Sequence, residues 1–328
     1  MKYIKKNYKF LLVIISIMLL FLIEFPYYIE APGGIDNMQD KIEIDGFKSE
    51  GSFNVAYVKE YRATIPTLII SFFNKNWDVI KEKEVLLENE TIDDYIMRDK
   101  LFMEESYSNA TYVAYRKANK KINILNSSSS VLYIDKKAKT NLKVGDNIIE
   151  IENNKINNKD EMINLIEKYD YGDKLNIKVQ NNNKNYNKYA KVIEIDNQKK
   201  LGIILVTLNK YETKPKINIK IEENESGASA GLIAALTIYN NLIEEDITHG
   251  LKIVGTGTID INGNVGSIGG VSYKLKSAVA KDADLFFVPN GDNYKEAIKI
   301  KKEKNYKIKI VAVSTFDEAI TYLDSLTN

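Results

Sequence analysis

The chain has 328 residues, no cysteine, one histidine and nearly balanced charges, with 46 Lys and Arg against 45 Asp and Glu. A chain without thiols cannot use a cysteine nucleophile, a disulfide or a thiolate metal site, and one histidine cannot build a multi-histidine metal centre. The charge balance gives no general reason to expect a nucleic-acid partner, which normally needs a basic excess. The length suggests two folded domains, and a hydrolase here needs an unusual base.

The first thirty residues have the pattern of a membrane-directing segment. Four lysines precede an apolar run from Phe10 to Ile23 that only Ser16 interrupts, and two tyrosines flank each end. No small-x-small cleavage site follows the run. We therefore expect residues 1–30 to form an uncleaved single-pass anchor, with the lysines in the cytoplasm and the rest of the chain outside the cell. The alternatives are a buried core helix and a soluble secreted protein released by signal peptidase.

The next segment, residues 31–120, changes from strand periodicity to helix periodicity. Apolar residues alternate between Ile42 and Tyr61, which predicts a hairpin of strands. The stretch Thr64–Asn119 has no glycine and predicts two or three helices. Thr91 opens the sequence T-I-D-D, a capping box, so one of these helices should begin directly after it.

A second unit covers residues 121–197. It contains L-K-V-G-D at Leu142–Asp146, a strand at Ile148–Ile151, an amphipathic helix near Lys159–Lys168, and a G-D-x-L-x-I-x-V strand. This order resembles a PDZ domain, although no Gly-Leu-Gly-Phe type loop is recognised. PDZ domains bind peptides by strand addition, so the resemblance implies a peptide-binding edge strand, while a spacer that binds nothing is the alternative. The candidate edge strand consists of Val131, Leu132, Tyr133 and Ile134.

From residue 198 to 328 strands alternate with helices, the pattern of an α/β domain. The sequence G-A-S-A-G at Gly227–Gly231 follows a strand and opens a helix. Ser229 therefore stands at a helix N-terminus, where free backbone N–H groups and the helix dipole can stabilise an oxyanion. Ser229 is a candidate nucleophile, although glycine, alanine and serine also begin helices for structural reasons alone.

A second glycine-bearing junction strengthens this hypothesis. It comprises G-T-G-T-I-D at Gly255–Asp260 and I-G-G-V-S-Y-K, which ends at Lys274. The two junctions together resemble the proteolytic domain of the Lon protease family, which pairs a serine in G-x-S-A-G with a lysine four residues after Gly-Gly. The resemblance implies Ser229 as nucleophile and Lys274 as base. It assigns supporting roles to Thr256, Gly227 and Ala228.

Two lysines near the second junction are candidates for the base. Lys276 is the rival of Lys274, and on a helix the two side chains project about 200° apart. A lysine base must be neutral, which burial in an apolar site favours.

Ala228 stands where the family has proline, and Ser226 where cytoplasmic Lon enzymes have aspartate. The single histidine, His249, is expected to be a surface residue without a catalytic role.

The whole layout is an α/β (α+β) Lon-type proteolytic domain with an inserted PDZ-like β-rich domain and an N-terminal transmembrane helix. It resembles the membrane-anchored, Lon-like PDZ proteases of bacteria, the SepM/YlbL group. The resemblance implies a serine endopeptidase that cleaves extracytoplasmic peptides or proteins, peptide signals among them. No Gly-x4-Gly-Lys-Ser/Thr phosphate loop occurs, so we expect neither nucleotide nor another cofactor. An oligomer remains open, and the alternative function is a catalytically inactive PDZ adaptor at the membrane.

Overall fold

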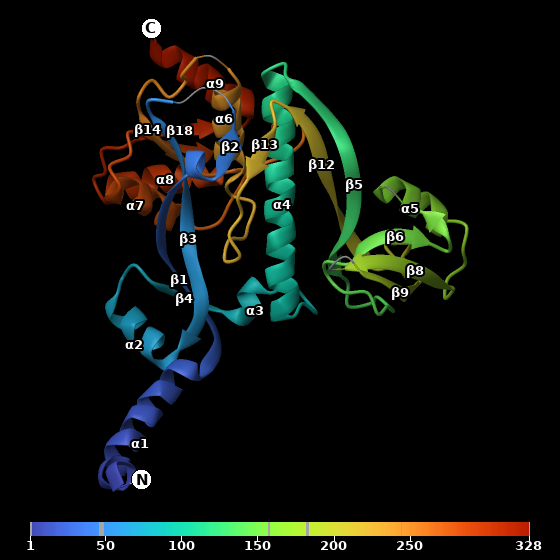
Figure 1. Cartoon of the computed structure of the whole chain (residues 1–328), viewed down its shortest axis with the longest axis horizontal. Coiled ribbons are helices and arrows are strands. Elements are labelled where there is room, and N and C mark those ends of the chain that lie inside the picture. Colours follow the sequence, from blue (N-terminus) through green and yellow to red (C-terminus); the bar gives the residue numbers. More distant parts are fainter. Residues whose placement is uncertain (1, 46–48, 157, 182–183, 244, 328) are drawn as a thin grey trace.

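The computed structural model has three parts: a projecting N-terminal helix, a body, and a smaller β-rich unit beside the body (Figure 1). The structure describes residues 2–45, 49–156, 158–181, 184–243 and 245–327.

The body is built on a six-stranded sheet that joins the two ends of the chain, in the order β18-β17-β14-β3-β1-β4. Its strands are β1 (Glu24–Asn37), β3 (Ser52–Thr64), β4 (Asp78–Lys81), β14 (Lys252–Gly255), β17 (Leu285–Pro289) and β18 (Lys309–Val313). Strand β3 pairs in parallel with β14 and antiparallel with β1. The segment before the β-rich unit and the last third of the chain therefore form one domain, and the β-rich unit is an insertion in it.

The predicted hairpin between Ile42 and Tyr61 is wrong. Strand β2 (Ile42–Ile44) pairs with β13 (Ile217–Ile219), more than 170 residues away in the sequence, whereas β3 pairs with the unexpected strand β1. Alternation marks a half-buried strand but does not identify its partner, because the partner is chosen by tertiary packing.

Three helices lie between Thr64 and Asn119, as expected, with β4 between the first two: α2 (Ile65–Phe73), α3 (Glu82–Val85) and α4 (Ile92–Lys117). The capping box at Thr91 is confirmed, because the Thr91 hydroxyl accepts the Asp94 N–H and the Asp94 carboxylate accepts the Thr91 N–H. Helix α4 stands upright in the middle of the molecule (Figure 1) and packs against α6 (Gly231–Leu242), most of whose residues are buried.

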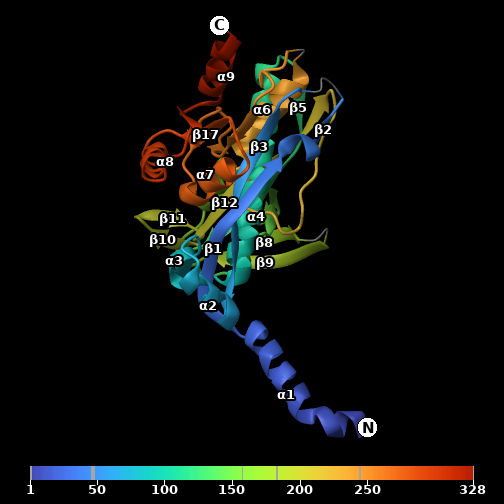
Figure 2. The ribbon, with the colours of Figure 1, turned by 90° about the vertical axis from the view of Figure 1, so that its left-hand side faces the viewer.

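The other helices complete the layers of the body. Helix α7 (Val271–Ala280) contacts β1 and β3, and it packs beside α8 (Asp292–Glu303), as Figure 2 shows from the side. Helix α9 (Phe316–Asp324) packs against α6 near the C-terminus. The remaining short elements are η1 (Met38–Asp40), β7 (Asn154–Lys155), β10 (Ile193–Ile195), β11 (Gln198–Lys200), β15 (Thr258–Ile259), β16 (Val265–Gly266) and η2 (Ser325–Thr327).

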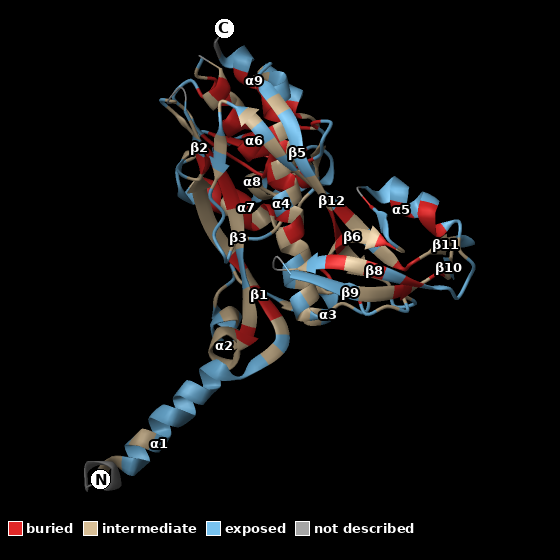
Figure 3. Cartoon of the chain, turned by 45° about the vertical axis from the view of Figure 1, so that its right-hand side comes forward, coloured by how far each residue is buried: buried red, intermediate tan, exposed pale blue. Residues whose placement is uncertain are grey.

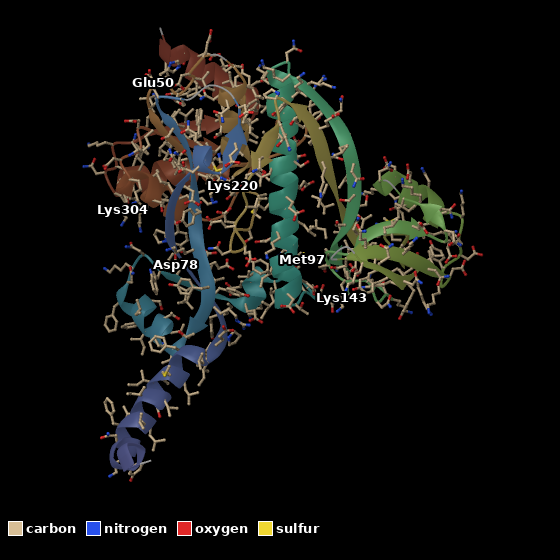
Figure 4. The ribbon with its side chains drawn as sticks, viewed as in Figure 1. Glu50, Asp78, Met97, Lys143, Lys220 and Lys304 are labelled. Carbon is tan, nitrogen blue, oxygen red and sulfur yellow. The ribbon has the colours of Figure 1, made fainter. Side chains whose placement is uncertain are left out.

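The inserted unit has its own sheet and core. A ribbon of β5 (Lys121–Ile134) and β12 (Ile203–Lys214) connects it to the body, and the sheet continues in the order β12-β5-β6-β8-β9. The other elements are β6 (Asn147–Ile151), β8 (Lys174–Asn181), β9 (Lys184–Lys191) and α5 (Lys159–Ile166). Figure 3 shows the buried residues of this unit as a cluster apart from those of the body. Leu101 of α4 packs on Val144 of the unit. Figure 4 labels Met97 of α4 and Lys143 of the unit.

Strand β5, which contains Val131–Ile134, is not the outer strand of its sheet, which corrects the expectation from the sequence. Strand β5 lies between β12 and β6, and Ile134 is paired with Ile203 of β12. On the other side the Val131 N–H donates to the Asp146 carbonyl oxygen at 2.9 Å. The outer strand of the sheet is β12, which follows Leu201-Gly202. It lies after residue 197, where the sequence predicts the end of the unit, so the sequence does not assign it to this sheet.

Helix α1 (Lys2–Leu22) projects away from the body (Figures 1 and 2) and exposes its apolar side chains from Phe10 onward, Leu11 partly excepted. Among the residues that the structure describes, no helix combines the length and apolar character that a membrane crossing requires. Membrane anchoring through residues 1–30 therefore stays a prediction.

Candidate active site

A cavity of about 640 Å³ brings Ser229 and Lys274 to one place. Its walls come from β1, β3, the start of α4, the loop before α6 and the loop before α7. A second cavity, of about 480 Å³, also reaches Ser229 and shares four residues of β3 with the first: Tyr57, Val58, Glu60 and Tyr61. Ser229 thus lies where two hollows meet, an arrangement that can receive an extended chain passing over the hydroxyl group.

The turn that presents Ser229 is held by helix α4. Gly227 has a φ of +87°, a left-handed conformation that favours glycine, and its N–H donates to the Asp99 carbonyl oxygen at 3.0 Å. The Ser106 hydroxyl donates to the Ala228 carbonyl oxygen at 2.8 Å. The two residues before Ser229 are therefore fixed by hydrogen bonds from one helix.

Thr256 connects the serine turn to the lysine. Its side chain is fully buried. The Lys274 amine donates to Thr256 Oγ1 at 3.2 Å, and Thr256 Oγ1 donates to the Ser229 carbonyl oxygen, also at 3.2 Å. The Gly257 N–H donates to the same carbonyl oxygen at 2.9 Å. Thr256, to which the resemblance assigns a supporting role, therefore lies beside the lysine.

Lys274 is a buried amine with a reduced proton affinity. Only 4% of the residue is exposed. Burial lowers the pKa of Lys274 to about 8, and the Glu30 carboxylate opposes this shift. A lysine with a pKa near neutrality is partly uncharged under ordinary conditions and can accept a proton.

Lys276 points elsewhere. Its amine donates to Asn76 Oδ1 at 2.6 Å, on the loop that follows α2, whereas Lys274 lines the cavity. Burial, followed by the nearby Lys304, also lowers the pKa of Lys276. A shifted pKa alone therefore does not separate the two lysines, and their positions do.

A row of three carboxylates crosses the sheet next to Lys274. Glu30 of β1 stands opposite Glu60 of β3 and opposite Asp78 of β4 in the strand register. Figure 4 labels Asp78, which accepts a hydrogen bond from the Tyr273 hydroxyl of α7. Burial raises the pKa of Glu30, Asp78 adds to the rise and Lys274 opposes it. Burial also raises the pKa of Glu60, which the Tyr95 hydroxyl opposes through a hydrogen bond of 3.0 Å.

This row of carboxylates cannot be predicted from the sequence, for a physical reason. Acidic residues directly opposite each other in a sheet repel, so the arrangement is not one that strand stability favours. Glu30 lies on β1, which was not recognised as a strand, and its alignment with Glu60 and Asp78 exists only once the three strands pair. The apolar and aromatic residues around Glu30 offered no signal of a charged site.

His249 lies outside the cavity, as expected. It is exposed, and its Nε2 is 3.0 Å from the Leu323 carbonyl oxygen. Within the described part of the chain, no group of three or more His, Cys, Asp and Glu side chains is arranged to hold a metal ion.

Comparison with known families assigns both domains. The family model of the PDZ domain matches residues 114–192, and that of the Lon protease (S16) C-terminal proteolytic domain matches residues 203–324. The chain therefore contains a PDZ domain and the proteolytic domain of a serine protease family. The two matches together are consistent with a Lon-like, PDZ-containing protease.

Individual proteins are similar to the chain over shorter stretches. The chain is 30% identical over 97 residues to the Lon protease of Aster yellows witches'-broom phytoplasma (strain AYWB), a match that covers 30% of this chain and 12% of that protein. The PDZ domain of the SdrC-like protein from Listeria monocytogenes is 26% identical, with a TM-score of 0.23, over 26% of this chain and 93% of that domain. The second domain of another Listeria protein is 29% identical, with a TM-score of 0.22, over 24% of this chain and 83% of that domain.

Proposed function

We propose that the chain is an ATP-independent serine endopeptidase in which Ser229 is the nucleophile and Lys274 the general base. The observation that carries the proposal is the buried Lys274 amine, which lines the same cavity as Ser229 and is tied to the serine turn through Thr256. The proteolytic domain match over residues 203–324 supports the reaction class.

The reaction is an acyl transfer. The Ser229 hydroxyl attacks a peptide carbonyl while the neutral Lys274 amine takes the hydroxyl proton. The tetrahedral oxyanion forms at the start of α6, where backbone N–H groups and the helix dipole favour negative charge. Lys274 then gives the proton to the leaving amine, and water hydrolyses the acyl-enzyme in a second step with the same lysine as base.

The turn before Ser229 lacks the proline of the family pattern but is held by other contacts. A proline before the serine would stiffen the turn, and here Ala228 is held instead by the Ser106 hydroxyl, while Gly227 is held by the Asp99 carbonyl. On the other side of the loop, Lys41 forms ion pairs with Glu225 and Asp36. These contacts support a turn that stays in place without the proline.

We further propose that residues 1–30 anchor the chain in the cell membrane, with the catalytic domain outside the cytoplasm. The support is the lysine-rich end and the exposed apolar surface of α1. The substrates are extracytoplasmic peptides or membrane-proximal proteins, with the processing of peptide signals as one role. Self-association into an oligomer belongs to the same proposal and can be measured on the purified chain.

The PDZ domain would select the substrate by strand addition. The free outer strand is β12, so we place the peptide against Ile203–Leu205 rather than against the interior segment Val131–Ile134. The alternative function, a peptide-binding adaptor without catalysis, rests on this domain together with Ala228 and Ser226.

The deciding experiment compares cleavage of a peptide library by the purified full chain and by Ser229→Ala and Lys274→Ala variants. Cleavage by the wild type that both variants lack supports the dyad. Lys276→Ala is the matched control and should stay active, because its amine is bonded to Asn76. If Lys276→Ala alone abolished cleavage, the assignment of the base would be wrong. If the wild type cleaves nothing, the adaptor function is favoured.

A further inference from the structure

Helix α2 carries apolar side chains that stay exposed in the described part of the chain. Of its nine residues, Thr67 and Ser71 are the polar ones, yet none of the nine is buried. Phe72 and Phe73 are 84% and 78% exposed, and their rings lie edge to face at 5.3 Å. Side chains of this kind are normally buried, so their joint exposure marks an interaction surface.

The turn after α2 carries the only tryptophan of the chain. The Trp77 N–H donates to the Asn74 carbonyl oxygen at 3.0 Å, and the indole lies edge to face with Tyr61 at 5.7 Å. Lys75, within the turn, is exposed. An apolar helix followed by a lysine and a tryptophan has the composition that proteins place at the boundary between lipid and water.

Helix α1 indicates what covers α2. Consecutive apolar residues of α1 are exposed, so all sides of that helix are apolar, which fits lipid better than a groove on one protein partner. Helix α1 contacts α2, and Figures 2 and 3 show both at the same end of the molecule. The 14 residues from Phe10 to Ile23 extend about 21 Å, less than the ~30 Å of a hydrocarbon core. The exposed surface of α2 adjoins this short segment.

We propose that α2 and Trp77 lie in the interface of the lipid bilayer that α1 enters, so that the protease body rests on the membrane at a second place. This inference rests on the proposed anchor. It has a consequence for the substrate, because Tyr61 both contacts Trp77 and lines the cavity that holds Ser229 and Lys274. The lipid contact therefore keeps the active-site cavity close to the membrane surface.

The test uses Trp77 as a built-in probe. The full chain is reconstituted into vesicles of phosphatidylcholine and phosphatidylglycerol, with or without bromine on the acyl chains, and vesicle attachment is checked by flotation. We expect brominated lipid to quench the Trp77 emission, because an indole in the interface lies against the acyl chains. The Phe72→Ser/Phe73→Ser variant should lose most of this quenching and still float, because α1 is unchanged.

The control is Ile124→Ser/Leu125→Ser, an apolar pair on β5 that is 60% and 72% exposed and lies away from α2. It should leave the quenching as in the wild type. A chain that floats with unquenched Trp77 overturns the inference and leaves the anchor standing, whereas a chain that does not float overturns both. If the Phe72→Ser/Phe73→Ser variant keeps the quenching but dissociates a dimer in detergent, α2 is a subunit interface and the inference is rejected.

Discussion

The proteolytic body and the PDZ domain each bury a charged side chain, and they treat it in opposite ways. Asp146 of the PDZ domain is fully buried and has three partners: the Lys188 amine at 2.6 Å, the Asn181 amide at 3.2 Å and the Lys143 N–H at 2.7 Å. Lys274 is buried with a hydroxyl group as its hydrogen-bond partner. Asp146 is thus satisfied by ionic and hydrogen-bonding partners within its own domain, whereas burial lowers the pKa of Lys274, which suits the proposed role of that amine as a base.

Replacing Lys274 should have the largest effect on catalysis. Lys274→Met should lower kcat/KM on the order of 10³-fold, since the serine loses its base. The same variant should be more stable at pH 7. The pKa of Lys274 is about 8 in the folded chain against about 10.4 when unfolded, so below pH 8 the folded state carries the full cost of the buried amine, and that cost declines as pH rises toward 10.4. We expect the free energy of unfolding, measured in urea at pH 7, to be ~1–3 kcal/mol higher for the variant than for the wild type. The difference should vanish near pH 11.

Replacing Asp146 should have the opposite effect on stability. Asp146→Ala leaves the Lys188 amine without its carboxylate partner, which should cost about 3–5 kcal/mol. Hydrogen exchange of β8 and β9 in the full chain would report the loss. The control is Glu150→Ala, which breaks the more exposed pair with Lys178 and should cost less than about 1 kcal/mol. If Lys274→Met and Asp146→Ala shift stability in the same direction, the comparison fails.

The dependence of kcat/KM on pH tests the lowered pKa of Lys274 directly. Because the proposed base is the neutral Lys274 amine, kcat/KM should rise about tenfold per pH unit below pH 8 and level off above it. Glu30 raises the pKa of Lys274, so Glu30→Gln should move the rising limb to lower pH. Glu104→Gln is a control on α4, remote from the lining of this cavity, and should leave the profile unchanged. A profile that falls with pH would exclude a neutral lysine base.

The smallest expected effect belongs to Thr256. Thr256→Val keeps the shape but removes the hydroxyl between the Lys274 amine and the Ser229 carbonyl, a loss of about 1 kcal/mol and roughly a fivefold drop in kcat/KM. Thr256→Ser should keep most of the activity because it keeps the hydroxyl. Equal losses in both variants, measured on one peptide substrate, would mean that packing rather than the hydrogen bonds matters there.

Local patterns in the sequence were enough for some of these features. The capping box at Thr91 depends on residues three apart, and α4 begins where it predicts. The residues Ser229, Thr256 and Lys274 were selected from glycine-rich junctions and their resemblance to a family, and the cavity contains Ser229 and Lys274, with Thr256 bonded between them.

Other features exist only in the folded chain. Strand β1 was not recognised, the partner of β2 was misassigned, and the outer strand of the PDZ sheet proved to be β12 rather than β5. Strand pairing joins segments far apart in the sequence, and no periodicity within one segment records its partner.

The sequence by itself determined the residue types at the active site: no thiol, one histidine, and a serine and a lysine in glycine-bearing turns. Tertiary structure decided which lysine is buried, which carboxylates stand beside it and which apolar helix remains uncovered. The physical reason is that proton affinity and exposure depend on surroundings, and the surroundings of Lys274 come from α7, β1 and the loop after β14.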